Sequence, residues 1–457
     1  MTTSRVALGL LVVFLMGLGT LIAAGEGAEV NGIYREESTK DFGESTKLDA
    51  LDALKDLKFR GWIDTYFAGK FNDPRNAQVA QATTEQKPAA AADQQPAANP
   101  VPYPAMGGPL VANPNPTSFN LGPLGKVYVT GVVSGLGFWQ SNRVRGDDES
   151  RADLSNGQVF IQTTEGPVQF FMQAGVYSLP ALGTPYLQAS KAVDAFYGPV
   201  PQVFLKLAPT DTFSIMVGAL PTLIGGETTF TFENFNIERG LLWNQENAVN
   251  RGVQANYTAG PVALSLSWND GYYSGEYKWL WGSVAYTIVP NHTVSFVGGA
   301  NLGTTRDSDV STPLFQNNSE IYNLIYTGSW GPWSLAPYLQ YTHVPANTRL
   351  GIQHDASTIG FALTGSYAFS DQFKLAARAE YISSTGRVSN GAPNLIFGPG
   401  SDAWSITVTP TYQYKILFGR AEFSYVGADS TTPGSAFGTT GTDTSQTRLM
   451  LEIGMLF

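Results

Sequence analysis

The chain ends on the stretch Thr447–Phe457, TRLMLEIGMLF, in which two kinds of side chain alternate. One set of alternate residues is wholly apolar and includes Leu449 and the terminal Phe457. The other set carries the opposite charges Arg448 and Glu452. This alternation is typical of a β-strand with one apolar face and one wet face. Because nothing follows Phe457 to cover the strand edge, we expect another part of the chain to pair with it.

The same alternation recurs from Thr117 onward, in segments of about 9 to 13 residues joined in turn by tight turns and by longer polar loops. Such segments, with short turns at one end and long loops at the other, are typical of a transmembrane β-barrel. A bilayer also requires that no strand edge stays open. We therefore predict an all-β fold, a transmembrane antiparallel β-barrel of about 18 strands, with 16 as the alternative count. The count of 18 includes a first strand near Phe59, against which the last strand is expected to close.

The N-terminus has the features of an export signal. Arg5 precedes the apolar run Val6 to Ile22, and small residues follow, so residues 1–24 are predicted to be a secretory signal peptide. A membrane-anchor helix is the alternative interpretation. Residues 25–57 are predicted to form a periplasmic segment with a short amphipathic helix, since leucines recur there at spacings of three.

The barrel is expected to span residues 58–457. Within it, residues 74–116 are rich in Pro and Ala and are predicted to form a long loop that does not pack in a core.

Composition excludes several classes of function. The formal net charge is −10, and no basic stripe is present, so nucleic acid is not expected as a partner. The chain contains no Cys, which excludes disulfides and cysteine metal sites. No metal and no cofactor are expected. Among the three histidines, His343 and His354 are the candidates for a barrel hydrolase, although no Ser or Asp is placed beside them by strand geometry in a way that suggests a catalytic triad.

Charged pairs lie on the lumen-facing set of residues near the C-terminus. Two interpretations are open: solvated ion pairs that hold the wall, or groups that order permeating ions. The candidate lumen-wall residues are Arg378, Glu380, Arg420, Glu422, Arg448 and Glu452.

The connection Pro221 to Gly252 is, at about 30 residues, far longer than usual loops. Its aromatic content is unlike that of a disordered segment, so we expect it to fold into the lumen; a cap over the barrel mouth is the alternative. Its glutamates, Glu246 among them, suggest a weak cation preference. The candidate pore-constriction residues are Glu227, Glu233, Asn234, Asn236, Glu238, Arg239, Asn244 and Arg251.

Two stretches carry a resemblance to a known family. FRGWIDTYFAGKFNDP, with Gly61, Asp64 and Tyr66, resembles the first strand of the OmpL-like beta-barrel porin family, and GALPTLIGGE with NFNIERG is similar to its mid-barrel segment. FNIERG is also similar to phosphate-selective porins, but the Lys-rich ladder that phosphate selectivity needs is not found.

The resemblance implies an outer-membrane porin, a water-filled channel for passive diffusion of small hydrophilic solutes or ions. The alternatives are a plugged structural or adhesin-type barrel and a barrel hydrolase. The expected partners are outer-membrane lipid, the solutes, the barrel-assembly machinery and further copies of the chain. The terminal Phe457 resembles the assembly signal of outer-membrane barrels.

Overall fold

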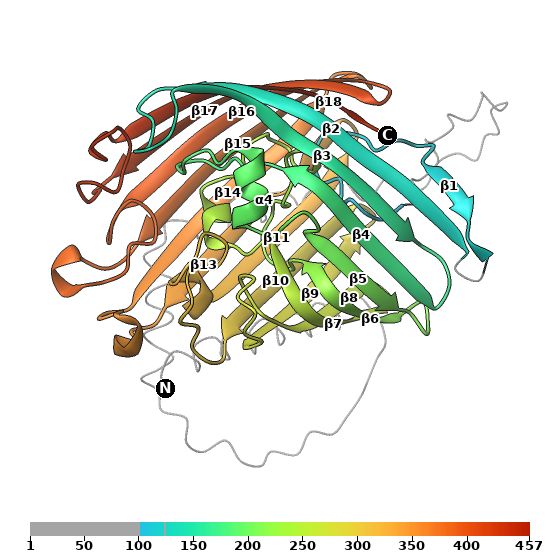
Figure 1. Cartoon of the computed structure of the whole chain (residues 1–457), viewed down its shortest axis with the longest axis horizontal. Coiled ribbons are helices and arrows are strands. Elements are labelled where there is room, and N and C mark those ends of the chain that lie inside the picture. The colour runs from blue at the N-terminus through green and yellow to red at the C-terminus, as the bar shows by residue number, and fades with distance from the viewer. Residues whose placement is uncertain (1–100, 123–124) are drawn as a thin grey trace, which may run out of the picture. The chain divides into compact units, whose positions relative to one another are not determined.

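The computed structural model describes residues 101–122 and 125–457, which form one antiparallel sheet closed into a barrel (Figure 1). Neighbours in sequence are neighbours in the sheet. The strands are β1 (Thr117–Asn120), β2 (Lys126–Gln140), β3 (Ser150–Thr163), β4 (Val168–Tyr177), β5 (Gln202–Leu207), β6 (Phe213–Pro221), β7 (Val249–Ala259), β8 (Val262–Asn269), β9 (Trp279–Val289), β10 (His292–Asn301), β11 (Glu320–Trp330), β12 (Trp333–Leu335), β13 (Tyr338–Val344), β14 (Ala356–Ala368), β15 (Phe373–Ser384), β16 (Asp402–Tyr414), β17 (Leu417–Asp429) and β18 (Ser445–Leu456).

Sixteen strands close the barrel and two short ones are extra, so the smaller of the two predicted counts describes the wall. β12 and β13 both lie between β11 and β14 and act as one strand interrupted at Ala336 and Pro337. Proline has no backbone N–H for the ladder, which explains the break. β1 pairs only with the beginning of β2, from Thr117 opposite Val129 to Asn120 opposite Lys126.

The barrel closes between β18 and β2. Arg448 lies opposite Gln140, and the register continues to Leu456 opposite Val132. This corrects the expectation that the last strand would close against a strand near Phe59, because both edges of β18 are already occupied by β17 and β2. The segment at Phe59 lies outside the described residues, as do residues 1–24 and 25–57.

The two ends of the barrel differ as the sequence predicts. Two-residue hairpin turns join β7 to β8 and β9 to β10, and Gly260 and Asn291 in these turns have φ values of 54° and 66°. Glycine and asparagine are the residues that accept this left-handed conformation most readily. Long loops occupy the other end. Among the described residues, no helix is long and apolar enough to cross a membrane.

Side chains alternate across the wall. On β18 the apolar Leu449, Leu451 and Ile453 are 47%, 52% and 62% exposed on the outer face, whereas Arg448 and Glu452 are buried inside. Apolar clusters also lie inside the barrel, where loops pack against inward residues such as Trp279 and Trp281. The helices are α4 (Ala189–Ala195), which lies against β3 and β4, and the short 3-10 helices η3 (Thr231–Glu233), η4 (Leu242–Gln245), η5 (Gln316–Asn318), η6 (Thr348–Leu350) and η7 (Val388–Asn390).

Residues 101–116, here called the lumen strap, also pack inside the barrel. Leu110 is 2% exposed and belongs to an apolar cluster with Phe160 of β3 and Phe418 of β17. The expectation that the Pro/Ala-rich tract does not pack is therefore wrong for this end of it. Polar wall groups satisfy the extended backbone of the strap, so it packs without forming a helix or strand of its own. The earlier part of the tract lies outside the described residues.

Candidate functional site

The segment Thr222–Ala248, here called the lumen loop, joins β6 to β7 and crosses to the far wall of the barrel. The N–H of Gly225 donates to Asn323 Oδ1 of β11 at 2.7 Å. Gln340 Nε2 of β13 donates to the carbonyl oxygen of Leu242 at 2.9 Å. The loop therefore lies inside the barrel and not over its mouth.

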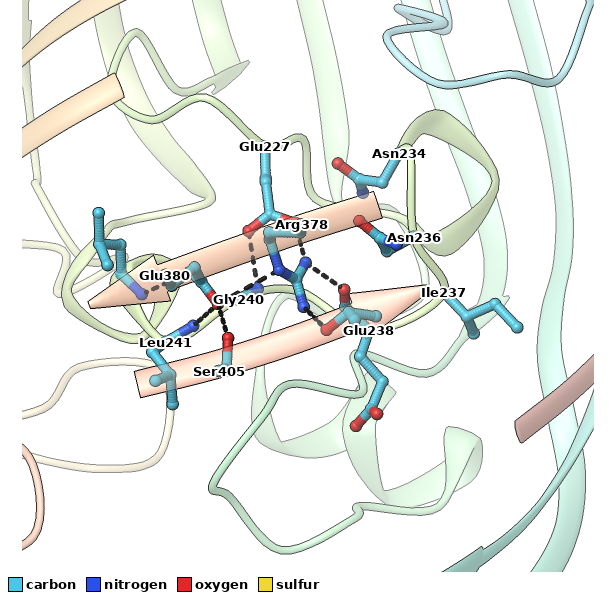
Figure 2. Close-up of polar contacts among 12 residues, drawn as sticks. Glu227, Asn234, Asn236, Ile237, Glu238, Gly240, Leu241, Arg378, Glu380 and Ser405 are labelled. Carbon is cyan, nitrogen blue, oxygen red and sulfur yellow. Dashed lines mark hydrogen bonds and ion pairs between the residues drawn. The ribbon is translucent and has the colours of Figure 1, made fainter. Parts of the chain in front are cut away.

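Two wall carboxylates bind the backbone of the lumen loop. Glu422 of β17 accepts hydrogen bonds from the N–H groups of Ile237 at 2.5 Å and Glu238 at 2.9 Å. Glu380 of β15 accepts from the N–H of Leu241 at 3.0 Å, as Figure 2 shows. Buried backbone N–H groups need such acceptors, because an unpaired one is costly inside a protein. The two carboxyl groups thus hold residues 237–241 of the lumen loop against the wall.

Arg378 of β15 lies between the wall and the loop (Figure 2). Its guanidinium donates to Glu227 Oε1 at 2.5 Å and to the carbonyl oxygen of Glu238 at 2.7 Å. It also lies 3.2 Å from the carboxylate of Glu380. The planar fork of an arginine suits several acceptors at once, so one side chain joins two parts of the loop to the wall.

Arg420 of β17 makes a similar bridge at the next part of the loop. It donates to the carbonyl oxygens of Thr231 at 2.9 Å and Asn234 at 3.2 Å. Its Nε donates to Glu452 of β18 at 3.1 Å. Wall arginines therefore donate hydrogen bonds to three carbonyl oxygens of the lumen loop, those of Thr231, Asn234 and Glu238.

Arg448 of β18 completes the set. Its guanidinium pairs with the carboxylate of Glu238 and donates to Gln140 Oε1 of β2 at 2.7 Å. The same group reaches the carbonyl oxygen of Ala181 at 3.4 Å, in the connection between β4 and β5. Arg448 therefore holds two inward-folded loops together.

The six predicted lumen-wall residues are thus buried side chains that bind the lumen loop or one another. Each is at most 5% exposed, so the interpretation as solvated wall pairs is wrong for the described structure. Of the pairs suggested by sequence, only Arg378 with Glu380 is formed; Arg420 instead pairs with Glu452. The reason is that the lumen loop supplies backbone donors and acceptors that the wall sequence cannot reveal.

Two cavities lie beside the lumen loop, along the wall from β4 to β7. The first, here the vestibule, has a volume of about 770 Å³ at the short-turn end and is lined by Lys206, Asn256 and turn residues such as Asp211. The second, here the chamber, has about 290 Å³ under the loop and reaches Glu227 and Glu233. Three residues line both cavities: Tyr103, Met216 and Gln254.

Comparison with known proteins decides the family. The family model described as "Putative beta-barrel porin-2, OmpL-like" matches residues 126–457. The chain belongs to this family. It is therefore an outer-membrane porin of bacteria, a channel protein with a transmembrane β-barrel.

Solved structures agree on the fold of this porin. An anion-selective porin from Comamonas acidovorans has a TM-score of 0.50 at 12% identity, covering 72% of this chain and 99% of its own. The outer membrane channel DcaP of Acinetobacter baumannii has a TM-score of 0.50 at 10% identity, covering 72% and 97%. No curated protein sequence matches.

The porin places the predicted constriction residues of the lumen loop inside the barrel, and Arg251 is the exception. Asn244 is half-buried and donates to the carbonyl oxygen of Leu182 at 2.9 Å. Arg251 lies on β7 in the same set of alternate residues as Val253, which is 45% exposed on the outer face. Arg251 therefore points outward, where its guanidinium lies 2.7 Å from Asp270. The prediction that it faces the pore is wrong. The buried lumen-loop members of the set are Glu227, Glu233, Asn234, Asn236, Glu238 and Arg239.

Arg239 is a buried charged side chain of the lumen loop. It is fully buried, and within the described residues none of its three guanidinium nitrogens has a hydrogen-bond partner. Its guanidinium carbon lies 5.3 Å from the ring centroid of Trp243. Burial lowers the pKa of Arg239 to about 10, so the side chain stays positive at neutral pH.

The glutamates of the lumen loop carry less free charge than their number suggests. Glu227 and Glu238 are each paired with an arginine of the wall. Burial raises the pKa of Glu233 to about 8 and that of Glu246 well above its usual range. At neutral pH Glu233 is therefore mainly protonated. Fewer charged carboxylates therefore support the weak cation preference expected from sequence, which stays a prediction.

Glu233 gives the docked lumen loop a pH dependence. Its pKa of about 8 in the docked loop exceeds the ordinary value of 4.5, so docking is strongest below pH 4.5 and weakens as pH rises toward 8. Each pH unit in that window costs the docked loop about 1.4 kcal/mol. We expect channel noise in planar bilayers to increase across this range and the increase to be smaller in Glu233→Gln. An identical increase in both proteins would contradict the assignment.

Sequence reasoning did not identify the residues that line both cavities. Met216 and Gln254 are inward by alternation, but so are many other residues, and nothing in their own sequence singles them out. Tyr103 lies in the tract expected not to pack. Their role follows only from the position of the lumen loop.

Proposed function

We propose that small hydrophilic solutes or ions diffuse through this porin along the wall from β4 to β7, by way of the vestibule and the chamber. The proposal is supported by the contact between the two cavities: Tyr103, Met216 and Gln254 line both of them. Polar groups such as Asn256 and Lys206 line the wider cavity and can hydrogen-bond to hydrated solutes. The buried residues of the lumen loop then form the narrow part of the passage.

We further propose roles for the two ends of the chain and for its outer face. Residues 1–24 direct export, residues 25–57 form a periplasmic segment, and Phe457 serves the barrel-assembly machinery. Outer-membrane lipid surrounds the apolar outer face. The proposal includes homo-oligomers, because β5 has only 6 residues and a spanning strand needs about 9 to 11, which suits contact with a second copy. We propose no catalytic activity for this porin.

The route is tested by narrowing it. Met216 points into both cavities, whereas the adjacent Val217 points outward and is 47% exposed. We expect Met216→Trp to slow liposome swelling with small sugars several-fold and Val217→Trp to leave it unchanged. Equal swelling rates for both variants would place the route elsewhere. Vesicles that stay sealed even with the unmodified protein would favour a plugged structural barrel.

A further inference from the structure

The lumen strap crosses the barrel between nearly opposite walls. At one end the ring of Tyr103 packs against Phe171 of β4, with 5.0 Å between centroids. Further along, Lys374 Nζ of β15 donates to the carbonyl oxygen of Pro109 at 2.6 Å. By strand order, β4 and β15 are separated by five strands along one side of the barrel and nine along the other. The strap therefore lies across the short-turn end of the lumen.

Wall side chains bind the strap as they would bind an extended peptide. Gln413 of β16 accepts from the N–H of Val111 and donates to its carbonyl oxygen, both at 2.8 Å. Gln162 Nε2 of β3 donates to the carbonyl oxygen of Tyr103 at 2.5 Å. Each contact is made to the backbone of the strap. Affinity thus comes from main-chain hydrogen bonds, with one aromatic side chain as an anchor.

The middle of the strap fits only without side chains. The N–H of Gly107 donates to the carbonyl oxygen of Glu233 in the lumen loop at 2.9 Å. A Cβ on Gly108 would lie 2.0 Å from the carbonyl oxygen of Asn234, closer than any real contact. One face of the strap is buried, but Val111 on the other is 54% exposed. Release of the strap would therefore disrupt the contacts of one face only, and the chain has no disulfide to prevent it.

We propose that the lumen contains a binding site for an extended peptide rich in Pro and Gly, and that the lumen strap is its resident, releasable occupant. Tyr103 lines both the vestibule and the chamber, so departure of the strap widens the passage where the two cavities meet. The strap is then a built-in plug at the periplasmic mouth. The inference rests on the proposed solute route for its effect on conductance, but not for release of the strap itself.

Release is measured by thiol labelling, because the chain contains no Cys. Leu110→Cys reports on the strap, and Leu242→Cys, buried in the lumen loop, is the matched control. We expect adding Tyr103→Ala to speed labelling of position 110 by a membrane-impermeant maleimide about tenfold, since the aromatic anchor is lost. Labelling of position 242 should not change. Heat-dependent gel mobility confirms that each variant is a folded barrel.

Occupancy of the site is tested with a synthetic peptide of residues 101–112, VPYPAMGGPLVA, applied to Tyr103→Ala channels in planar bilayers. We expect Tyr103→Ala to raise conductance several-fold and the peptide to lower it again. A matched peptide with both central glycines changed to Ala should not block, because it would meet the carbonyl of Asn234.

Two results would overturn the inference: unchanged labelling at position 110 in Tyr103→Ala, or equal block by both peptides. If no variant conducts, the proposed channel route fails, and the labelling experiment still decides whether the strap is released.

Discussion

Arg378→Ala is expected to release the lumen loop and to raise single-channel conductance several-fold. The substitution leaves the buried carboxylate of Glu227 without its ion-pair partner and removes the donor to the carbonyl of Glu238. Breaking a buried ion pair by removing one partner costs about 3 to 5 kcal/mol. A change of about 3 kcal/mol shifts the docking equilibrium more than a hundredfold. The barrel itself should persist, since backbone ladders close it.

The matched control removes both charges of the ion pair. In Arg378→Met with Glu227→Gln neither charge of this pair is left. Glu380 loses the guanidinium at 3.2 Å but keeps its hydrogen bond from Ser405 at 2.6 Å. The conductance of this double variant should rise clearly less than that of Arg378→Ala. Arg349→Ala, in an exposed turn, controls for loss of positive charge. If all three variants conduct alike, Arg378 does not hold the loop.

Deletion of Phe457 is expected to reduce the assembled barrel in the outer membrane about tenfold or more while export continues. The backbone of Phe457 exchanges two hydrogen bonds with Gly131 of β2, at 2.8 and 2.9 Å, at the closing seam. The phenyl ring lies over Gly131, where an added Cβ would come within 2.4 Å of it. The deletion therefore removes the last pair of hydrogen bonds between β18 and β2, together with the proposed assembly signal.

Two variants separate these effects. Phe457→Tyr keeps an aromatic terminus and should assemble. Gly131→Ala keeps the terminus but disturbs the closing seam, because its Cβ would lie 2.4 Å from the ring and 2.8 Å from the carbonyl oxygen of Gln158. Phe373→Ala, an exposed aromatic at the same end of the barrel, controls for general loss of aromatic surface. Heat-dependent gel mobility of outer-membrane fractions measures assembly. Normal assembly after deletion of Phe457 would refute the proposal, and a defect as large in Gly131→Ala would assign the effect to closure alone.

The outward and inward faces of the wall could be predicted from sequence, because apolar and polar residues alternate within each strand. The alternation of Leu449 and Leu451 with Arg448 and Glu452 recurs in the structure as exposed and buried residues. Tight turns at Ala259 and Val289 also lie where predicted. Alternation and turn chemistry are local, so no knowledge of partners is needed.

Partners could not be predicted in the same way. Arg420 was matched by sequence with Glu422, two residues away, yet it pairs with Glu452 across the strand interface and with carbonyls of the lumen loop. Register and loop docking depend on contacts between residues far apart in the chain.

By itself, the sequence determined a transmembrane barrel of the porin type, since strand length, alternation and turn spacing are each set by the bilayer and the β-pleat. The tertiary structure alone decided that β18 closes against β2, that the lumen loop is clamped by buried charges, and that the lumen strap lies across the mouth. The physical reason is that a wide barrel leaves space that the wall cannot fill. Which segments fill it depends on the backbone groups and charges that meet there, and not on any local pattern.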